Sequence, residues 1–129
     1  MSDLRPVLPF DGGLELKLQS REIDGIVIID LYGKLMGGPD ADIVRDALHG
    51  IIDGGNRRVV INLRGVNWIN STGVGILMTG YTTMRRSGGD LKLLNVSDRL
   101  QSILYVTKLN LIFECFDSED EAVASFEND

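Results

Sequence analysis

The alternation of strand-like and helix-like segments along this chain limits its fold more than any other feature. Apolar runs rich in Val, Ile and Leu predict strands over residues 26–32, 57–63, 90–96 and 111–116. Between and after them, apolar residues recur at the spacing of amphipathic helices, over residues 39–52, 70–86, 97–104 and 118–126. Strands joined through helices build a parallel sheet with right-handed crossovers.

A hairpin precedes this alternating part. Leu14, Leu16 and Leu18 alternate with polar residues, and Asp24-Gly25 is a strong turn signal before the next apolar run. The predicted order is therefore β-β-α-β-α-β-α-β-α, an α/β fold whose mixed sheet has a parallel core. We expect one domain over residues 14–127, preceded by a flexible leader over residues 1–13.

Residues that start and stop helices support these boundaries. Pro39 and Asp40 suit a first helical turn, and Gly54-Gly55 provide a stop. Ser97 is a candidate N-cap, and Ser118 with Glu121 forms the S-x-x-E pattern of a capping box.

Charge and hydropathy exclude several classes of function. The 129-residue chain has a formal net charge of −6 and no clustered basic face, so we expect no direct binding of nucleic acid. No apolar run approaches the roughly 18 residues of a membrane span. The first ten residues lack the apolar stretch of a signal peptide. The sequence thus predicts a cytoplasmic protein without membrane insertion.

The residues that catalysis or metal binding would need are sparse. His49 is the one histidine, and no second His or Cys stands near it at a metal-ligand spacing. Cys115, flanked by Phe113 and Phe116, is expected to be a buried, inert thiol. No G-x-S-x-G elbow and no P-loop is present. We therefore predict no catalytic residue, metal or cofactor, and a protein that binds another protein.

One segment stands out where a strand ends and a helix begins: Asn70-Ser71-Thr72-Gly73-Val74-Gly75. Asn70 or Ser71 can cap the helix, and a phosphate on Ser71 would sit at the positive end of the helix dipole. Gly73 and Gly75 remove side-chain bulk, so a partner could approach the hydroxyl closely. The same residues also suit a plain helix cap with glycines for tight packing, and the residues alone leave both interpretations open.

At this segment the sequence resembles the STAS family, specifically its stand-alone anti-sigma factor antagonists. The family pattern has an aromatic and an apolar residue, then Asp-Ser-Ser/Thr-Gly-Leu-Gly and an apolar helix. Here Trp68 and Ile69 precede the motif, and ILMTGYTTMRRSGG follows it. The resemblance extends over roughly residues 14–127 and includes GKL, VVINL, DLKLLNVS and LIFECFDSEDEAVASF.

This resemblance implies a bacterial partner switch. Such a protein, unphosphorylated, binds an anti-sigma factor that is also a serine kinase, and so frees the sigma factor. The kinase phosphorylates the serine that matches Ser71, the complex dissociates, and a serine phosphatase resets the switch. We expect the docking surface to contain Asn70, Ser71, Thr72, Gly73, Gly75, Ile76 and Thr79. Ile76 is equally compatible with ordinary core packing.

Two positions depart from the family pattern. Asn70 stands where the family has an acidic residue, so the charge before the serine is lost. Met36 stands where the family has an acidic residue after the second strand, and Asp40 or Asp42 are candidates to replace it. Docking without phosphorylation is therefore an alternative, as an accessory subunit of a lipid-transport ATPase or a signalling scaffold. A small nucleotide-binding protein is a third hypothesis.

Overall fold

A computed structural model describes residues 15–128 of the protein; the predicted leader over residues 1–13 and Leu14 lie outside that range. The described residues form one five-stranded sheet in the spatial order β1-β2-β3-β4-β5. The strands are β1 (Lys17–Ile23), β2 (Ile26–Leu35), β3 (Arg58–Ile69), β4 (Asp90–Leu94) and β5 (Cys115–Phe116). The helices are α1 (Pro39–Asp53), α2 (Ser71–Arg86), α3 (Asp98–Val106) and α4 (Glu119–Ser125), with the 3-10 turns η2 (Leu109–Leu111) and η3 (Phe126–Asn128).

The pairing of the strands confirms the predicted mixed sheet. β1 runs antiparallel to β2, and β2–β3, β3–β4 and β4–β5 are parallel pairs. The hairpin turn is Asp24-Gly25, with φ of 54° and 81°. Two consecutive positive φ values are what a two-residue turn between twisted strands requires. The element order is the predicted one.

Helix starts and stops agree with the sequence signals. α1 begins at Pro39 and ends before Gly54, whose neighbour Gly55 has a φ of +95°. The Oγ of Ser97 accepts a hydrogen bond from the amide of Leu100 at 3.1 Å. The Oγ of Ser118 accepts one from the amide of Glu121 at 3.3 Å. These caps fix where α3 and α4 leave the sheet.

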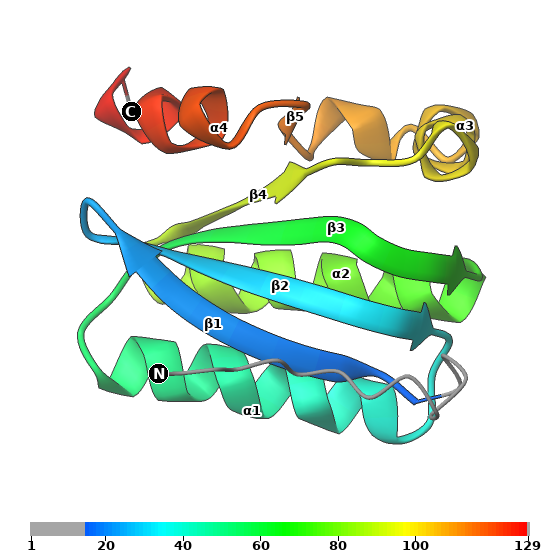
Figure 1. Ribbon diagram of the computed structural model, residues 1–129, viewed down its shortest axis with the longest axis horizontal. Helices are drawn as coiled ribbons and strands as arrows, with labels where there is room; N and C mark the ends of the chain where they lie inside the picture. Colours follow the sequence, from blue (N-terminus) through cyan, green and yellow to red (C-terminus); the bar gives the residue numbers. More distant parts are fainter. Residues whose placement is uncertain (1–14, 129) are drawn as a thin grey trace.

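The helices divide between the two faces of the sheet (Figure 1). α1 and α2 cover one face, where the larger core buries β2 and β3 residues such as Ile29 and Ile61 with Leu77 of α2. α4 lies against the other face, where Phe126 packs with Ile28 in a smaller core. The carboxyl ends of β2 and β3 lie next to the start of α2 at one edge of the sheet (Figure 1).

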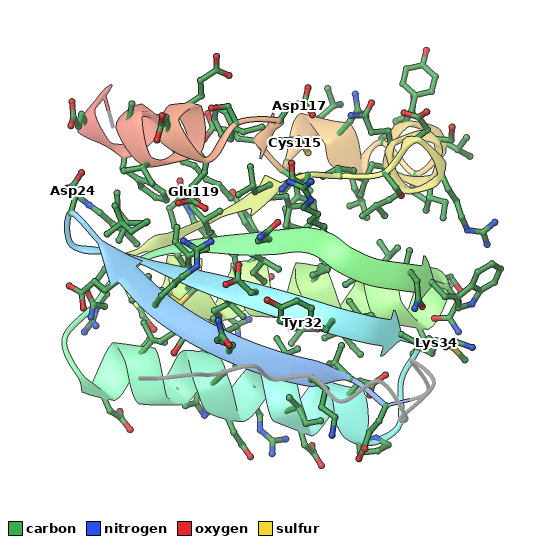
Figure 2. The ribbon with its side chains drawn as sticks, in the orientation of Figure 1. Asp24, Tyr32, Lys34, Cys115, Asp117 and Glu119 are labelled. Carbon is green, nitrogen blue, oxygen red and sulfur yellow. The ribbon has the colours of Figure 1, made fainter. Side chains whose placement is uncertain are left out.

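A polar cluster lies on the α4 side of the sheet. The guanidinium of Arg21 on β1 donates to both oxygens of Asp30 on β2, at 2.7 and 3.1 Å. It also donates to both oxygens of Glu119 at the start of α4, at 3.1 and 2.7 Å (Figure 2). The side-chain amide of Asn62 on β3 donates to Asp30 Oδ1 at 2.8 Å. We call these four residues the Arg21 cluster.

Ionic contacts within the Arg21 cluster shift the pKa values of Arg21 and Glu119. Hydrogen bonds from Arg21 lower the pKa of Glu119, and hydrogen bonds to Glu119 and Asp30 raise the pKa of Arg21. Nearby Tyr32, which projects from β2 (Figure 2), has a raised pKa because it is partly desolvated and faces the charge of Asp30. The cluster ties β1, β2, β3 and α4 together through charge-assisted hydrogen bonds.

The predictions for the last strand and for Cys115 were wrong in part. Only Cys115–Phe116 pair with β4, and Leu109–Leu111 form η2 after Lys108 turns the chain with a φ of 65°. Cys115 is exposed on this edge strand, not buried. Partial desolvation and the charge of Asp117 still raise the pKa of its thiol, which keeps it protonated at neutral pH.

Within residues 15–128, no helix is both long enough and apolar enough to cross a membrane.

Candidate functional site

The start of α2 lies at the carboxyl edge of the sheet, next to the last residues of β2 and β3. Leu35 of β2 pairs with Ile69 of β3, and Asn70 then connects β3 to α2, whose first residue is Ser71. Open parallel sheets commonly place binding sites at this edge, because the connecting loops converge there.

Asn70 is the N-cap of α2. Its backbone is extended (φ −117°, ψ −175°), and its Oδ1 accepts a hydrogen bond from the amide of Gly73 at 2.8 Å. The residues left Asn70 and Ser71 as alternative caps, and the structure selects Asn70. The hydroxyl of Ser71 is therefore not needed to cap the helix.

Ser71 is exposed in the first turn of α2, as the expected docking surface requires. Its hydroxyl makes no hydrogen bond to any other residue in the range 15–128. The amides at the start of a helix precede the regular i to i−4 pattern, and they carry the positive end of the dipole. An added phosphate would therefore face solvent in a favourable electrostatic position without displacing the cap.

Gly73 does not belong to the exposed surface, contrary to the sequence-based expectation. It is buried, and a Cβ at this position would fall on the carbonyl oxygen of Leu35 and lie 2.8 Å from Cγ1 of Ile69. The missing side chain lets α2 approach the ends of β2 and β3 closely. Gly73 therefore sets how closely the first turn of α2, with Ser71, approaches the sheet.

Ile76 was expected on the docking surface, with core packing as an equal alternative, and the structure supports core packing. Only 8% of Ile76 is accessible, and it belongs to the larger core. α1 packs along this flank of α2, so α2 is buried more widely than one apolar stripe indicates. The other residues of the expected surface, Thr72, Gly75 and Thr79, are exposed.

The loop after β2 adjoins the start of α2. A Cβ on Gly37, whose φ is +123°, would lie 2.8 Å from Cγ2 of Thr72. The carboxylate of Asp40 accepts hydrogen bonds from the amides of Met36 and Gly37, at 2.9 and 3.2 Å. Asp40 thus holds the loop beside Thr72.

Asp42, the other candidate for the missing acidic residue, pairs instead with Arg45. The distance from its Oδ1 to Nη1 of Arg45 is 2.9 Å, and both lie on the solvent side of α1. Asp40 and Asp42 are therefore each engaged by groups of this chain, and neither carboxylate hydrogen-bonds the Ser71 hydroxyl.

Sequence reasoning missed the exposed apolar side chains near Ser71. Trp68 and Met36 are 43% and 41% exposed. The guanidinium of Arg99 lies 4.2 Å from the centroid of the Trp68 ring, a cation–π contact. Trp68 pairs in register with Lys34 at the carboxyl end of β2 (Figure 2). The sequence analysis used Trp68 as the aromatic residue before the family motif and did not predict that its side chain is exposed.

The register between β2 and β3 is irregular next to Trp68. Gly33 pairs with Val66 and Lys34 with Trp68, so β3 contains one extra residue at this point. Such a bulge interrupts the alternation of side chains between the two faces.

Comparison with known proteins agrees with the predicted family and fold. The family model described as STAS domain matches residues 17–122. A curated protein named "Putative anti-sigma factor antagonist BtrV", from Bordetella bronchiseptica, is 27% identical over 111 residues, which cover 86% of this chain and 95% of that protein.

Two solved structures share the fold at low sequence identity. An anti-sigma factor antagonist from Mycobacterium paratuberculosis superimposes with a TM-score of 0.73 at 18% identity, covering 86% of this chain and 93% of the other. The Bacillus cell fate determinant SpoIIAA in its phosphorylated form superimposes with a TM-score of 0.67 at 20% identity, covering 85% and 99%.

Proposed function

Because the chain belongs to the STAS domain family, we propose that it is an anti-sigma factor antagonist that works by partner switching. In this proposal the unphosphorylated protein binds an anti-sigma factor that is also a serine kinase. Phosphorylation of Ser71 releases the complex, and a serine phosphatase restores the binding form. The protein acts by binding and not by catalysis, in the cytoplasm. The exposed Ser71 hydroxyl beside a cap formed by Asn70 carries the proposal.

The cap geometry supports a switch that leaves the fold intact. Asn70, not Ser71, holds the amide of Gly73, so a phosphoserine keeps the first turn of α2 capped. Negative charge at a helix N-terminus stabilises the helix by up to about 1 kcal/mol. The phosphorylated protein should therefore stay folded, and the switch should act on the interface alone.

The charge that a phosphate on Ser71 adds is large enough to dissociate the complex. A phosphate adds about −1.5 to −2 charges at neutral pH. Burying such a charge in a complex without a partner costs several kcal/mol, and each 1.4 kcal/mol corresponds to a tenfold change in affinity. A reduction of affinity by about two orders of magnitude or more is expected.

Phosphate mapping tests the site. We expect incubation with the anti-sigma factor kinase of the same organism and Mg-ATP to place one phosphate on Ser71. The variant Ser71→Ala should remain unmodified, and the matched control Ser102→Ala, which removes an exposed hydroxyl of α3, should be modified normally. Phosphate located only at other residues, as determined by peptide mass spectrometry, would refute the proposed switch.

Asn70 favours a second candidate function, docking without efficient phosphorylation. An amide cannot supply the charge that a carboxylate supplies next to the serine, and Asp40 and Asp42 are engaged elsewhere. The protein would then be an accessory subunit of a lipid-transport ATPase or a signalling scaffold. Stable binding to a transporter ATPase subunit that persists in Ser71→Asp would favour this candidate over the switch.

A further inference from the structure

An apolar groove runs between α1 and α2, adjoining the turn that carries Ser71. Its volume is about 360 Å³. Residues that line it include Val44, Leu48, Thr72, Gly75, Ile76 and Gly80. Thr72 directly follows Ser71, so the groove and the Ser71 hydroxyl belong to one continuous surface.

The two glycines of the groove have different environments. A Cβ on Gly80 would lie 3.0 Å from Cδ1 of Leu48, so Gly80 lets α1 and α2 pack closely. A Cβ on Gly75 would have no atom within 4 Å, and Gly75 has no positive φ. Glycine lowers helix stability relative to alanine, and no contact within residues 15–128 requires it at position 75.

The charges beside the groove limit what could occupy it. On α1, Arg45 lines the groove and pairs with both Asp42 and Asp46, at 2.9 and 3.2 Å. The two carboxylates lie outside the groove lining and outweigh the charge of Arg45, so the solvent side of this flank carries an excess of negative charge. On α2 the rim consists of the uncharged residues Thr72, Gly75 and Thr79. A complementary segment would present an aliphatic side chain to the groove and a basic residue to the exposed carboxylates of Asp42 and Asp46.

We propose that the groove between α1 and α2 receives an aliphatic side chain of the anti-sigma partner, from a segment with an adjacent basic residue, and that Gly75 sets how closely this segment approaches. This inference rests on the proposed function, since it names the second contact that the same partner makes. Ser71 provides the switch, and the groove provides affinity that does not depend on phosphorylation.

A matched pair of substitutions tests the groove. Gly75→Ala and Gly50→Ala each add a methyl group to an open helical position, on α2 and α1 respectively. Both should raise the thermal midpoint by about 2–5 °C, because alanine favours the helix. Titration calorimetry with the purified anti-sigma factor kinase should show about tenfold weaker binding for Gly75→Ala, because the added methyl group overpacks a well-fitted contact. Binding of Gly50→Ala should be unchanged.

Two further variants extend the test. Gly75→Met should weaken binding more than Gly75→Ala, because it fills more of the groove. Asp42→Asn combined with Asp46→Asn should weaken binding about threefold at low salt and less at high salt, since it removes the charges that would face the basic residue.

The outcomes separate the groove from the switch. If Ser71→Asp loses affinity while Gly75→Ala and Gly75→Met bind as the wild type does, the groove proposal is overturned and the proposed function stands. If the wild type does not bind any anti-sigma factor kinase of the organism, both are overturned. A dimer that Gly75→Met abolishes would assign the groove to a second copy. If the NMR chemical shifts of the groove amides change when residues 1–14 are deleted, the groove would be assigned to residues 1–14. Either of these last two results overturns the proposal.

Discussion

Two polar regions of the molecule use their hydrogen-bonding groups in opposite ways. In the Arg21 cluster every charged group faces a partner: Arg21 contacts Asp30 and Glu119, and Asn62 contacts Asp30. At the start of α2 the Ser71 hydroxyl has no partner within residues 15–128, and only Asn70 is engaged, as the cap. The first arrangement stabilises the fold, and the second leaves a hydroxyl exposed to solvent.

Substitution of Asp30 should separate the two regions most clearly. Asp30→Ala leaves Arg21 without the more buried of its two carboxylate partners and costs about 2–3 kcal/mol of unfolding free energy, less than a fully buried pair because Arg21 is 36% exposed. Chemical denaturation measures this loss. Asp53→Ala, at the exposed end of α1, is the control and should change stability by less than about 0.5 kcal/mol.

Partner binding should be almost insensitive to that substitution. We expect the Asp30→Ala protein, where it remains folded, to bind the anti-sigma partner with wild-type affinity, because the Arg21 cluster lies on the sheet face covered by α4. A large loss of affinity at equal folded fraction would show that the two regions are coupled.

Substitution at Ser71 should give the reverse pattern. Ser71→Asp is expected to lower partner affinity at least tenfold while changing unfolding free energy by less than about 1 kcal/mol, since the charge sits at a helix N-terminus. The control Ser102→Asp adds the same charge to an exposed position of α3. Equal loss of affinity in both variants would argue for a general charge effect.

Asn70 caps α2 and directly precedes Ser71, and substitutions of Asn70 should have smaller effects than those of Asp30 and Ser71. Asn70→Ala removes the acceptor of the Gly73 amide and should cost about 1 kcal/mol. Asn70→Asp keeps an acceptor and restores the carboxylate found in the family pattern, so we expect wild-type stability or slightly more. Radiolabel incorporation at Ser71 should be faster in Asn70→Asp than in the wild type, and an unchanged rate would exclude a role for that charge.

Acid titration should reveal the smallest effect on stability, which comes from Glu119 of the Arg21 cluster. Hydrogen bonds from Arg21 lower the pKa of Glu119 below its ordinary value of 4.5. The stabilisation from ionised Glu119 is therefore complete above about pH 4.5 and is lost as the pH falls through the lowered folded-state pKa. The side chain is 34% exposed, so solvent screening keeps the effect small.

Comparison with Glu119→Gln isolates this contribution. Unfolding free energy measured between about pH 3 and pH 6 should fall less steeply on acidification in Glu119→Gln than in the wild type. Parallel curves would show that Glu119 contributes nothing through its charge.

How far the sequence predicts these regions depends on whether local or long-range contacts decide them. The Asp24-Gly25 turn and the caps at Ser97 and Ser118 depend on a few neighbouring residues, and the sequence predicted them. It also narrowed the cap of α2 to Asn70 or Ser71. These features need only local backbone chemistry.

Gly73 and Ile76 show where local patterns fail. Helical periodicity identifies one buried stripe of α2, but it does not reveal that α1 covers a second flank and buries Ile76. The burial of Gly73 depends on the distance between α2 and the carbonyl of Leu35, which lies 38 positions earlier in the chain. Cys115 is exposed because β5 is a two-residue edge strand, a length that its apolar neighbours did not indicate.

The most direct test compares two forms of the same protein. The anti-sigma factor kinase is titrated, in the calorimeter, into unphosphorylated protein and into protein carrying phosphate on Ser71. We predict at least a hundredfold lower affinity for the phosphorylated form, with identical circular dichroism spectra for the two forms. Equal affinities, or an unfolded phosphorylated form, would contradict the claim that Ser71 switches an interface on an unchanged fold.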